Sequence, residues 1–283
     1  MKFYLGGLGN YYESLEFVKD AIIEADRLGF DGALMPDHYM WGEMMGHRVA
    51  DGYSTVDTWM TLTYLAAKTE QIKLGTLVTP IPFRPPAMLA KMLSTLDVLS
   101  GGRVVLGVGA GWSQVEFDGY SVWDGAKVRV DKTEEGLKLI LRLWTEDEVT
   151  FKGKYYEAKG AVVKPKPVQK PYPKLLFGGT GKRMLSMAGR YGDIVYIPPW
   201  SGANIPEMRA RVLRAAEAAG RADKMAFMGG EMGSLGGFDF KEARLKVERA
   251  WESGSTYYLT SFPREGYKES MHRFAEEIIS SYR

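Results

Sequence analysis

The stretch from residue 72 to residue 108, IKLGTLVTPIPFRPPAMLAKMLSTLDVLSGGRVVLGV, contains one complete unit of the predicted fold. Its two ends, 72–78 and 103–108, are short apolar runs, typical of parallel strands that are buried on both faces. Between them, Pro85 and Pro86 suit the first turn of a helix that extends to Leu99. The stretch therefore predicts a strand, a helix and a second strand in succession.

The same alternation of apolar runs and amphipathic stretches extends over the rest of the chain. Strands are predicted at 2–8, 32–36, 174–177, 193–197, 225–228 and 256–260. Helices are predicted after the N-cap Ser14, ending near Gly29, and at 56–68, 130–144, 182–191, 205–219, 238–253 and 267–281. Alternating strands and helices indicate an α/β protein with a parallel sheet.

Eight strands, each followed by a helix, favour a closed barrel. The chain has 283 residues, and a (β/α)8 TIM barrel typically needs roughly 250. An open doubly wound sheet is the alternative, but the count of eight favours closure, so we predict one barrel domain over residues 1–283. Residues 145–173 break the rhythm with a hairpin pattern and a Lys/Pro-rich run, which predicts an insertion between the fourth helix and the fifth strand.

Composition excludes several classes of function. The chain has 37 basic and 35 acidic residues and a formal net charge of +2, which argues against a nucleic-acid partner. It has no cysteine, no zinc-protease motif and no carboxylate–histidine cluster at ligand spacing, so no metal site is expected. No signal peptide and no apolar run of ~20 residues is visible. We therefore expect a cytoplasmic protein without a membrane partner.

The strongest catalytic candidates follow the strand at 32–36. In a barrel of this kind the active site lies at the carboxyl ends of the strands, and Asp37 and His38 stand there. Histidine is the side chain best suited to proton transfer near neutral pH, whereas His47 and His272 are expected at the surface. The alternatives are a structural hydrogen bond for His38 and a turn-forming role for Asp37.

Two further strand ends carry candidate ligand-binding residues. Thr76 and Thr79 could present hydroxyls to a ligand, or simply fill the strand as β-branched residues. Gly109 and Gly111 let backbone amides approach a ligand closely. Trp112 either stacks on a planar ring or packs against the protein.

The end of the fifth strand predicts a phosphate site. Gly178, Gly179 and Thr180 precede a helix that starts near Lys182, and exposed amides at a helix start bind anions. A plain turn is the alternative.

Aromatic residues are expected to line a substrate pocket that suits a flat organic ring. These residues are Trp41, Trp59, Trp200 and Phe262.

Five segments together resemble the luciferase-like flavin-dependent oxidoreductases, particularly the branch that uses the deazaflavin coenzyme F-420. They are PDHYMW at 36–41, LGTLVTP at 74–80, LSGGRVVLGVGAGW at 99–112, LWTEDEVTFKGKYY at 143–156 and PKPVQKPYPKLLFGGTGKR at 165–183. The resemblance covers nearly the whole chain. It implies a barrel with the ring of coenzyme F-420 or FMN at its carboxyl mouth, and a homodimer.

The resemblance also implies roles for individual residues. His38 would face the cofactor ring, with Asp37 beside it. A non-proline cis peptide near Thr76–Leu77 would form a bulge that supports the ring. Gly178, Gly179 and Thr180 would bind the cofactor phosphate.

This chain departs from the sugar-phosphate dehydrogenases of the family at one position. Those enzymes place a catalytic glutamate directly after the strand-four glycines, where this chain has Trp112, and this argues against a sugar-phosphate substrate. Glu116 is the nearest acid. The short connection before the last strand predicts an open substrate pocket.

We therefore expect an oxidoreductase that transfers a hydride between coenzyme F-420 and a small organic substrate. His38 would orient substrate and ring or move a proton, and Asp37 would fix its tautomer. Three alternatives remain open: an FMN-dependent luciferase-like monooxygenase, a non-redox barrel enzyme such as a sugar-phosphate isomerase or aldolase, and a catalytically silent flavin-binding protein.

Overall fold

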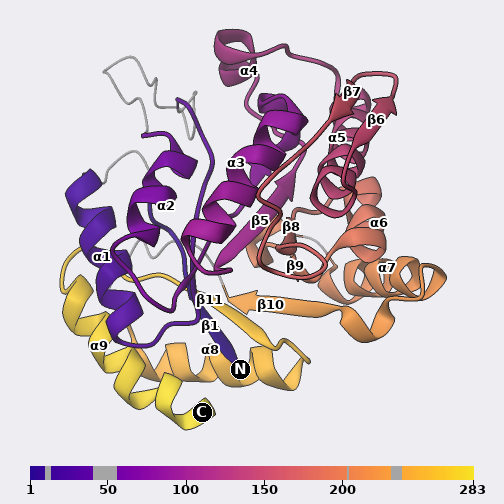
Figure 1. The fold of residues 1–283 in the computed structure, drawn as a ribbon. Coiled ribbons are helices and arrows are strands. Elements are labelled where there is room, and N and C mark those ends of the chain that lie inside the picture. Colours follow the sequence, from indigo (N-terminus) through magenta and orange to yellow (C-terminus); the bar gives the residue numbers. More distant parts are fainter. Residues whose placement is uncertain (10–13, 41–55, 203, 231–237) are drawn as a thin grey trace.

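Eight parallel strands form a closed barrel in the computed structural model, which describes residues 1–9, 14–40, 56–202, 204–230 and 238–283 (Figure 1). The barrel strands are β1 (Lys2–Leu5), β2 (Gly32–Met35), β3 (Lys73–Thr76), β5 (Val104–Gly109), β8 (Lys174–Gly178), β9 (Ile194–Tyr196), β10 (Ala226–Gly230) and β11 (Tyr257–Thr260). β1 pairs with β11 and β3 pairs with β5, and these pairings close the sheet into a barrel. The predicted (β/α)8 barrel is confirmed.

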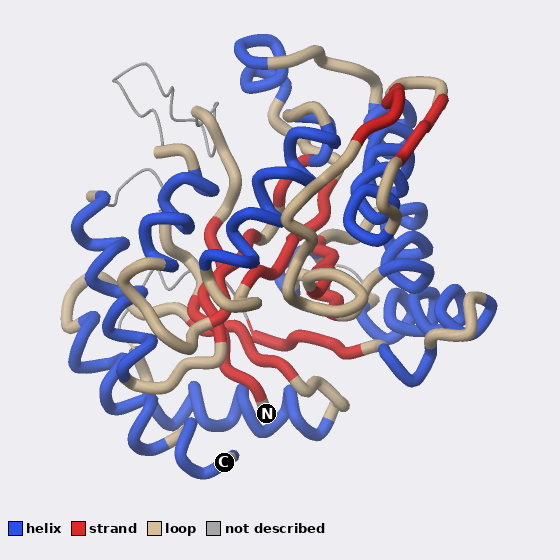
Figure 2. Tube along the Cα trace, viewed as in Figure 1, coloured by secondary structure: helices blue, strands red, loops and turns tan. Residues whose placement is uncertain are grey.

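Helices surround the strands (Figure 2). They are α1 (Leu15–Arg27), α2 (Thr58–Ala66), α3 (Pro86–Leu99), α4 (Gln114–Tyr120), α5 (Ala126–Thr145), α6 (Lys182–Tyr191), α7 (Ile205–Ala218), α8 (Phe240–Glu252) and α9 (Tyr267–Glu277). The start of α1 is as predicted, because the Ser14 hydroxyl accepts a hydrogen bond from the Phe17 amide. Gly29 follows the helix with a positive φ of 80°, which suits glycine at a helix end.

The largest differences from the sequence-based expectation lie around β3 and β5. The predicted strand at 72–78 ends at Thr76, and the two-residue strand β4 (Thr79–Pro80) continues the pairing with β5. The short helix α4 was not predicted at all. The predicted hairpin is present as β6 (Val149–Lys152) and β7 (Glu157–Ala161), between α5 and β8.

Two apolar layers hold the fold together. Side chains inside the barrel fill its interior, among them Tyr4, Leu34, Val105, Leu176 and Met228. The alternate residues of the same strands point outward and pack beneath the helices in a larger cluster. Each strand is covered on both faces, and for this reason the strand sequences are continuous apolar runs without polar residues in alternation.

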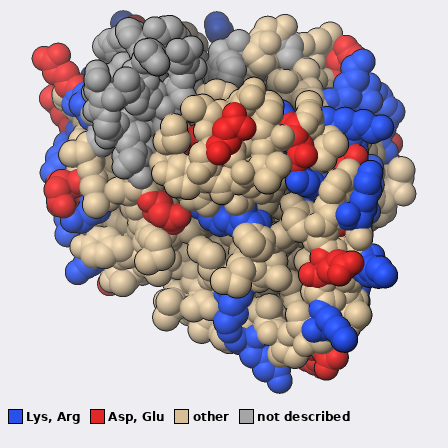
Figure 3. Space-filling view, turned by 90° about the horizontal axis from the view of Figure 1, so that it is seen from above, with Lys and Arg blue, Asp and Glu red and all other residues tan. Residues whose placement is uncertain are grey.

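The surface carries both signs of charge. On the face shown in Figure 3, basic and acidic side chains are interspersed among uncharged residues. Within the described residues, no helix combines the length and the apolar composition that crossing a membrane requires.

Candidate active site

A histidine–glutamate pair occupies the carboxyl end of the barrel. Nδ1 of His38, in the loop after β2, lies 2.7 Å from Oε2 of Glu116 in α4. The other glutamate oxygen accepts the backbone amides of Tyr39 and Met40 at 2.9 and 3.3 Å. Glu116 is only 1% exposed, so these contacts take the place of water around a buried carboxylate.

The glutamate decides which ring nitrogen carries a proton. A carboxylate only accepts hydrogen bonds, so Nδ1 of His38 must donate the proton between them. In the neutral imidazole Nε2 then keeps its lone pair, which is the form that accepts a proton from a reacting group. We expected Asp37 to hold this tautomer, but the carboxylate on Nδ1 is that of Glu116.

Glu116 belongs to the helix that sequence reasoning missed. Ser113 and Glu116 have the spacing of a capping box, S-x-x-E, and this pattern could have located the start of α4. The Ser113 hydroxyl makes no capping hydrogen bond, and the Glu116 carboxylate reaches the loop after β2. The local pattern thus marks the helix, while its acidic residue serves a tertiary contact.

Asp37 forms a buried ion pair with Arg84, the residue that follows the 3-10 turn η1 (Ile81–Phe83). The guanidinium donates to both carboxylate oxygens, at 2.7 and 2.9 Å. The Thr79 hydroxyl donates a third hydrogen bond to Asp37 at 2.7 Å. This cluster anchors the chain on the amino-terminal side of His38 and leaves Asp37 in a positioning role.

Neighbouring charges and burial set the ionisation of this cluster. Burial lowers the pKa of the Arg84 guanidinium, but the charge and hydrogen bonds of Asp37 outweigh it, so the pKa is raised overall. Burial raises the pKa of Tyr39 to about 12, against the lowering influence of Arg84. Arg84 therefore stays charged and Tyr39 stays neutral across the range in which histidine titrates.

The two threonines expected to face a ligand are buried and bond to other protein groups. Thr76 and Thr79 are fully buried, and their hydroxyls lie 3.0 Å apart. The Thr76 hydroxyl also accepts the Gly107 amide at 3.2 Å. The indole N–H of Trp59 donates to Thr79 at 3.1 Å. These side chains join β3, β4, β5 and α2. The threonines thus fill the strands, which is the alternative named above, and the buried Trp59 does not line a pocket as expected.

The bulge after β3 is formed around a cis peptide between Leu77 and Val78, one residue later than expected. Glycines surround it because larger residues do not fit. A Cβ at Gly109 would lie 2.4 Å from Cγ2 of Val78, and one at Gly178 would lie 3.0 Å from both Leu77 and Val78. Packing against the bulge therefore requires a glycine at position 109. From the sequence we had explained this glycine only by the close approach of a backbone amide to a ligand.

The predicted phosphate site lies at the start of α6. Gly178 ends β8, and Gly179 has a positive φ of 126° with open space where a Cβ would be. The Gly179 amide already donates to the Tyr196 carbonyl at 3.2 Å. The amides left for an anion are those at the helix start, since Gly181 is an N-cap without a side chain. Thr180 lies half-buried directly before it.

Trp112 and Ser113 complete the surroundings of His38. Trp112 is 54% exposed, and its ring meets the His38 ring edge-on with centroids 5.6 Å apart. The Ser113 hydroxyl is buried without a hydrogen-bond partner among the described residues. An orphaned hydroxyl beside an exposed aromatic ring is what a binding site for a flat polar ring presents.

The remaining sequence candidates fall elsewhere. Phe262 is buried beneath the helices in contact with Phe30, Phe238 and Phe274, so it belongs to the core and does not line a pocket. Trp41 and His47 lie outside the described residues, as does the side chain of Trp200. His272 lies on α9, 2.7 Å from Glu24 and 46% exposed, which agrees with a surface role. The described residues contain no cluster of metal-ligating side chains.

Comparison with known proteins identifies related sequences. The chain is 35% identical over 182 residues to an F420-dependent glucose-6-phosphate dehydrogenase of Intrasporangium calvum, a match that covers 62% of this chain and 51% of that protein. It is 31% identical over 190 residues to an FMNH(2)-dependent dimethylsulfone monooxygenase of Pseudomonas putida, covering 66% and 49%. The matches thus span about half the length of these relatives.

Solved structures agree on the fold. An F420-dependent secondary alcohol dehydrogenase, in complex with an F420-acetone adduct, superposes with a TM-score of 0.80 at 23% identity and covers 99% of both chains. The model of one protein family, described as luciferase-like monooxygenase, matches residues 3–232. Because that match spans most of the chain and all but the last barrel strand, this protein belongs to the luciferase-like monooxygenase family.

Proposed function

We propose that this protein is an oxidoreductase that transfers a hydride between coenzyme F-420 and a small organic substrate bearing a hydroxyl or carbonyl group. The observation that carries the proposal is the His38–Glu116 pair at the carboxyl end of the barrel, beside the exposed Trp112. The named activities of the relatives support the redox class.

The residues present fit a flavin-like cofactor. The bulge at Leu77 and Val78 closes the barrel below the site, and Gly178 lets it lie close to β8. Thr180 and the first amides of α6 would hold the phosphate. The Ser113 hydroxyl offers a hydrogen bond to the polar edge of a ring. When bound, the deazaflavin supplies the hydride chemistry.

The protein's own part is proton transfer and orientation. In the oxidation of an alcohol, Nε2 of His38 would take the hydroxyl proton, and the deazaflavin held by Thr180 and the first amides of α6 would supply the hydride acceptor. Glu116 holds Nδ1–H and stabilises the imidazolium that results. In the reverse direction the same nitrogen returns the proton to the carbonyl oxygen.

Two measurements test this proposal. Titrations with FMN and with coenzyme F-420, followed by fluorescence quenching, identify the cofactor. With the preferred cofactor bound, His38→Ala should lower turnover at least about tenfold, which is within the range of acid–base contributions. The affinity for the cofactor should stay the same. Unchanged turnover in His38→Ala would remove its role in proton transfer.

A second candidate is an FMN-dependent monooxygenase on the same fold. The similarity to the dimethylsulfone monooxygenase favours it. Reduced FMN and oxygen would replace the deazaflavin, and the same phosphate site would serve both cofactors. Tight binding of FMN together with oxygen uptake that depends on substrate would decide for this reading over the first.

We further propose a homodimer in the cytoplasm that forms through α2 and α3. Apolar side chains of these helices lie exposed, among them Met60 and Tyr64 of α2 and Met88 of α3, and exposed apolar patches mark interaction surfaces. Met60→Glu combined with Met88→Glu should convert a dimer into a monomer in light scattering, whereas a monomeric wild type would contradict the proposal.

A further inference from the structure

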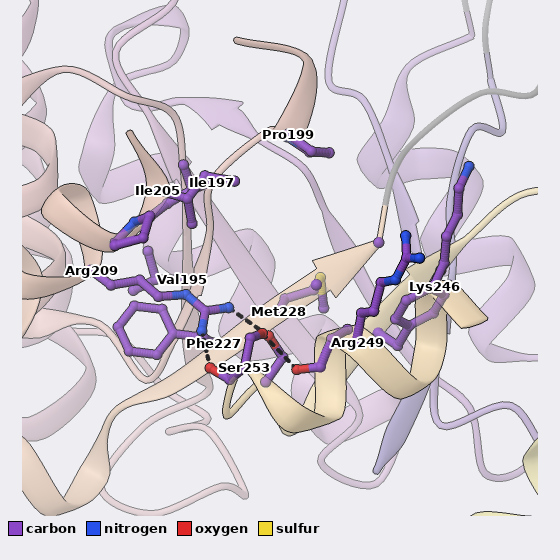
Figure 4. Close-up of a pocket in the computed structure, with 16 residues that line it drawn as sticks. Val195, Ile197, Pro199, Ile205, Arg209, Phe227, Met228, Lys246, Arg249 and Ser253 are labelled. Atoms are coloured by element: carbon purple, nitrogen blue, oxygen red, sulfur yellow. Dashed lines mark hydrogen bonds between the residues drawn. The ribbon is translucent and has the colours of Figure 1, made fainter. Parts of the chain in front are cut away.

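A cavity of about 540 Å³ opens between α7 and α8, outside the barrel wall (Figure 4). Its floor consists of residues from three neighbouring strands: Val195 of β9 with Ile197 just after that strand, Phe227 of β10 and Tyr258 of β11. Ile205, at the start of α7, contributes to one wall. This volume is within the usual range for small-molecule sites, roughly 300–1,000 Å³.

The cavity is separate from the His38 site. Val195, Phe227 and Tyr258 belong to the apolar layer beneath the helices. Met228, which also lines the cavity, belongs to the cluster that fills the barrel interior. Side chains of one strand alternate between the two faces of the sheet. The cavity therefore lies mainly on the outer face of the barrel wall, and its described lining includes none of the residues around His38.

Among the described residues, the charged side chains that line the cavity are all cationic: Arg209 of α7 and Lys246 and Arg249 of α8. Lys246 pairs with Glu242 at 3.0 Å. Within the described residues, neither arginine forms an ion pair. Two guanidinium groups thus line a mostly apolar cavity to which the described part of the chain contributes no carboxylate.

Arg209 is held in place by neutral groups. Its guanidinium donates to the Ser253 carbonyl and the Ser255 hydroxyl at the far end of α8 (Figure 4). It also lies over the Phe227 ring, 4.7 Å from the centroid. Burial alone lowers the pKa of Arg209. A fixed, partly buried cation above an aromatic floor is a preformed receptor for an anion.

We propose that this cavity binds a small amphipathic carboxylate. The apolar body of the ligand lies on the floor formed by Val195, Ile197 and Phe227. Its carboxylate binds Arg209 and Arg249, which come from the two helices that flank the cavity, α7 and α8. A neutral apolar ligand would leave both cations unpaired, and a compact polar anion would leave the floor uncovered, so the site selects a molecule that has both parts.

Isothermal titration with octanoate tests the proposal. We expect saturable binding of one octanoate per chain, with 1-octanol binding more weakly because it lacks the charge. Arg249 is exposed and without a hydrogen bond or ion pair among the described residues, so Arg249→Gln should leave the fold intact. The substitution should weaken octanoate about tenfold, which is the loss of one charge-assisted hydrogen bond, and leave octanol unchanged.

Arg214→Gln is the matched control, because Arg214 is an exposed arginine of α7 that does not line the cavity. It should bind octanoate as the wild type does. Saturating FMN or coenzyme F-420 should not displace octanoate. Absence of saturable binding, equal affinity in Arg249→Gln and wild type, or displacement by either cofactor would each overturn the proposal.

Discussion

Nδ1 of His38 and Oε2 of Glu116 lie 2.7 Å apart, although 78 positions separate the two residues in the chain. They come from two strand–helix units that are not consecutive, and they meet only because both follow the carboxyl end of a barrel strand. The glutamate also holds the backbone on the far side of His38 through the amides of Tyr39 and Met40. One buried carboxylate therefore controls both the position and the tautomer of the histidine.

The first prediction concerns this tautomer. Glu116→Gln keeps an oxygen for the backbone amides but presents an amide N–H to Nδ1, which forces the proton of His38 onto Nε2. Turnover should fall about tenfold or more, with cofactor affinity retained and the pH profile altered. Glu135→Gln is a matched control, because Glu135 likewise accepts backbone amides, here those of residues 154–156. An unchanged pH profile in Glu116→Gln would contradict the assignment.

The second prediction concerns Trp112. Indole is only a hydrogen-bond donor and does not ionise near neutral pH, so Trp112 should stack or pack and leave proton transfer to His38. Trp112→Phe keeps an aromatic ring beside His38 and should retain most activity with the same pH profile. Steady-state rates across pH check this. If Trp112→Phe lost all activity while His38→Ala kept it, proton transfer could not be assigned to His38.

The third prediction concerns the phosphate site. Gly179 is a poor position to test it, since any side chain there meets a strained positive φ. Thr180→Val removes one hydroxyl at nearly constant shape, and cofactor affinity should fall about tenfold, or ~1.4 kcal/mol. Ser186→Ala is the control, one turn further along α6, where the hydroxyl bonds only to the Lys182 carbonyl. Equal affinities in both variants would place the phosphate elsewhere.

The fourth prediction concerns the Asp37–Arg84 pair. Asp37→Asn leaves the buried Arg84 guanidinium with only the Asp57 carboxylate, at 3.2 Å, as a counter-charge. Breaking a buried pair typically costs about 3–5 kcal/mol of the free energy of unfolding, and Asp57 should hold the loss near the lower end of that range. Glu146→Gln breaks the exposed pair with Arg142 and should change stability far less, because exposed ion pairs contribute little. Urea denaturation of both variants measures the difference. Equal small effects would show that Asp37 and Arg84 contribute little to the fold.

Hydrophobic periodicity was enough to predict the barrel, because each strand and helix can be recognised from the residues of its own segment. Helix α3 begins at Pro86 and ends at Leu99 as its prolines and apolar pattern predict. The same reasoning failed at β3, where the continuous apolar run 72–78 gives no sign of a break after Thr76. The break depends on β5, whose glycines leave the space that the displaced chain needs.

The candidate site was predicted only in part for a similar reason. His38 was located by its place after a strand, which is a local feature. Its partner was assigned to Asp37 because that residue is adjacent, and only the three-dimensional arrangement shows that Arg84 takes Asp37 and that α4 brings Glu116. Hydroxyl, indole and carboxylate groups that look available in a sequence are often already used by one another, as Thr79, Trp59 and Asp37 are here.

The bulge after β3 is inseparable from glycines on two other strands. A Cβ at Gly107 would lie 1.9 Å from the carbonyl oxygen of Thr76, and the steric limits at Gly109 and Gly178 concern Val78 and Leu77. These positions therefore form one module that can be transplanted into another barrel only as a whole. A designer who grafts the loop 77–78 without the three glycines would obtain a clash, and one who grafts the glycines alone would obtain a void.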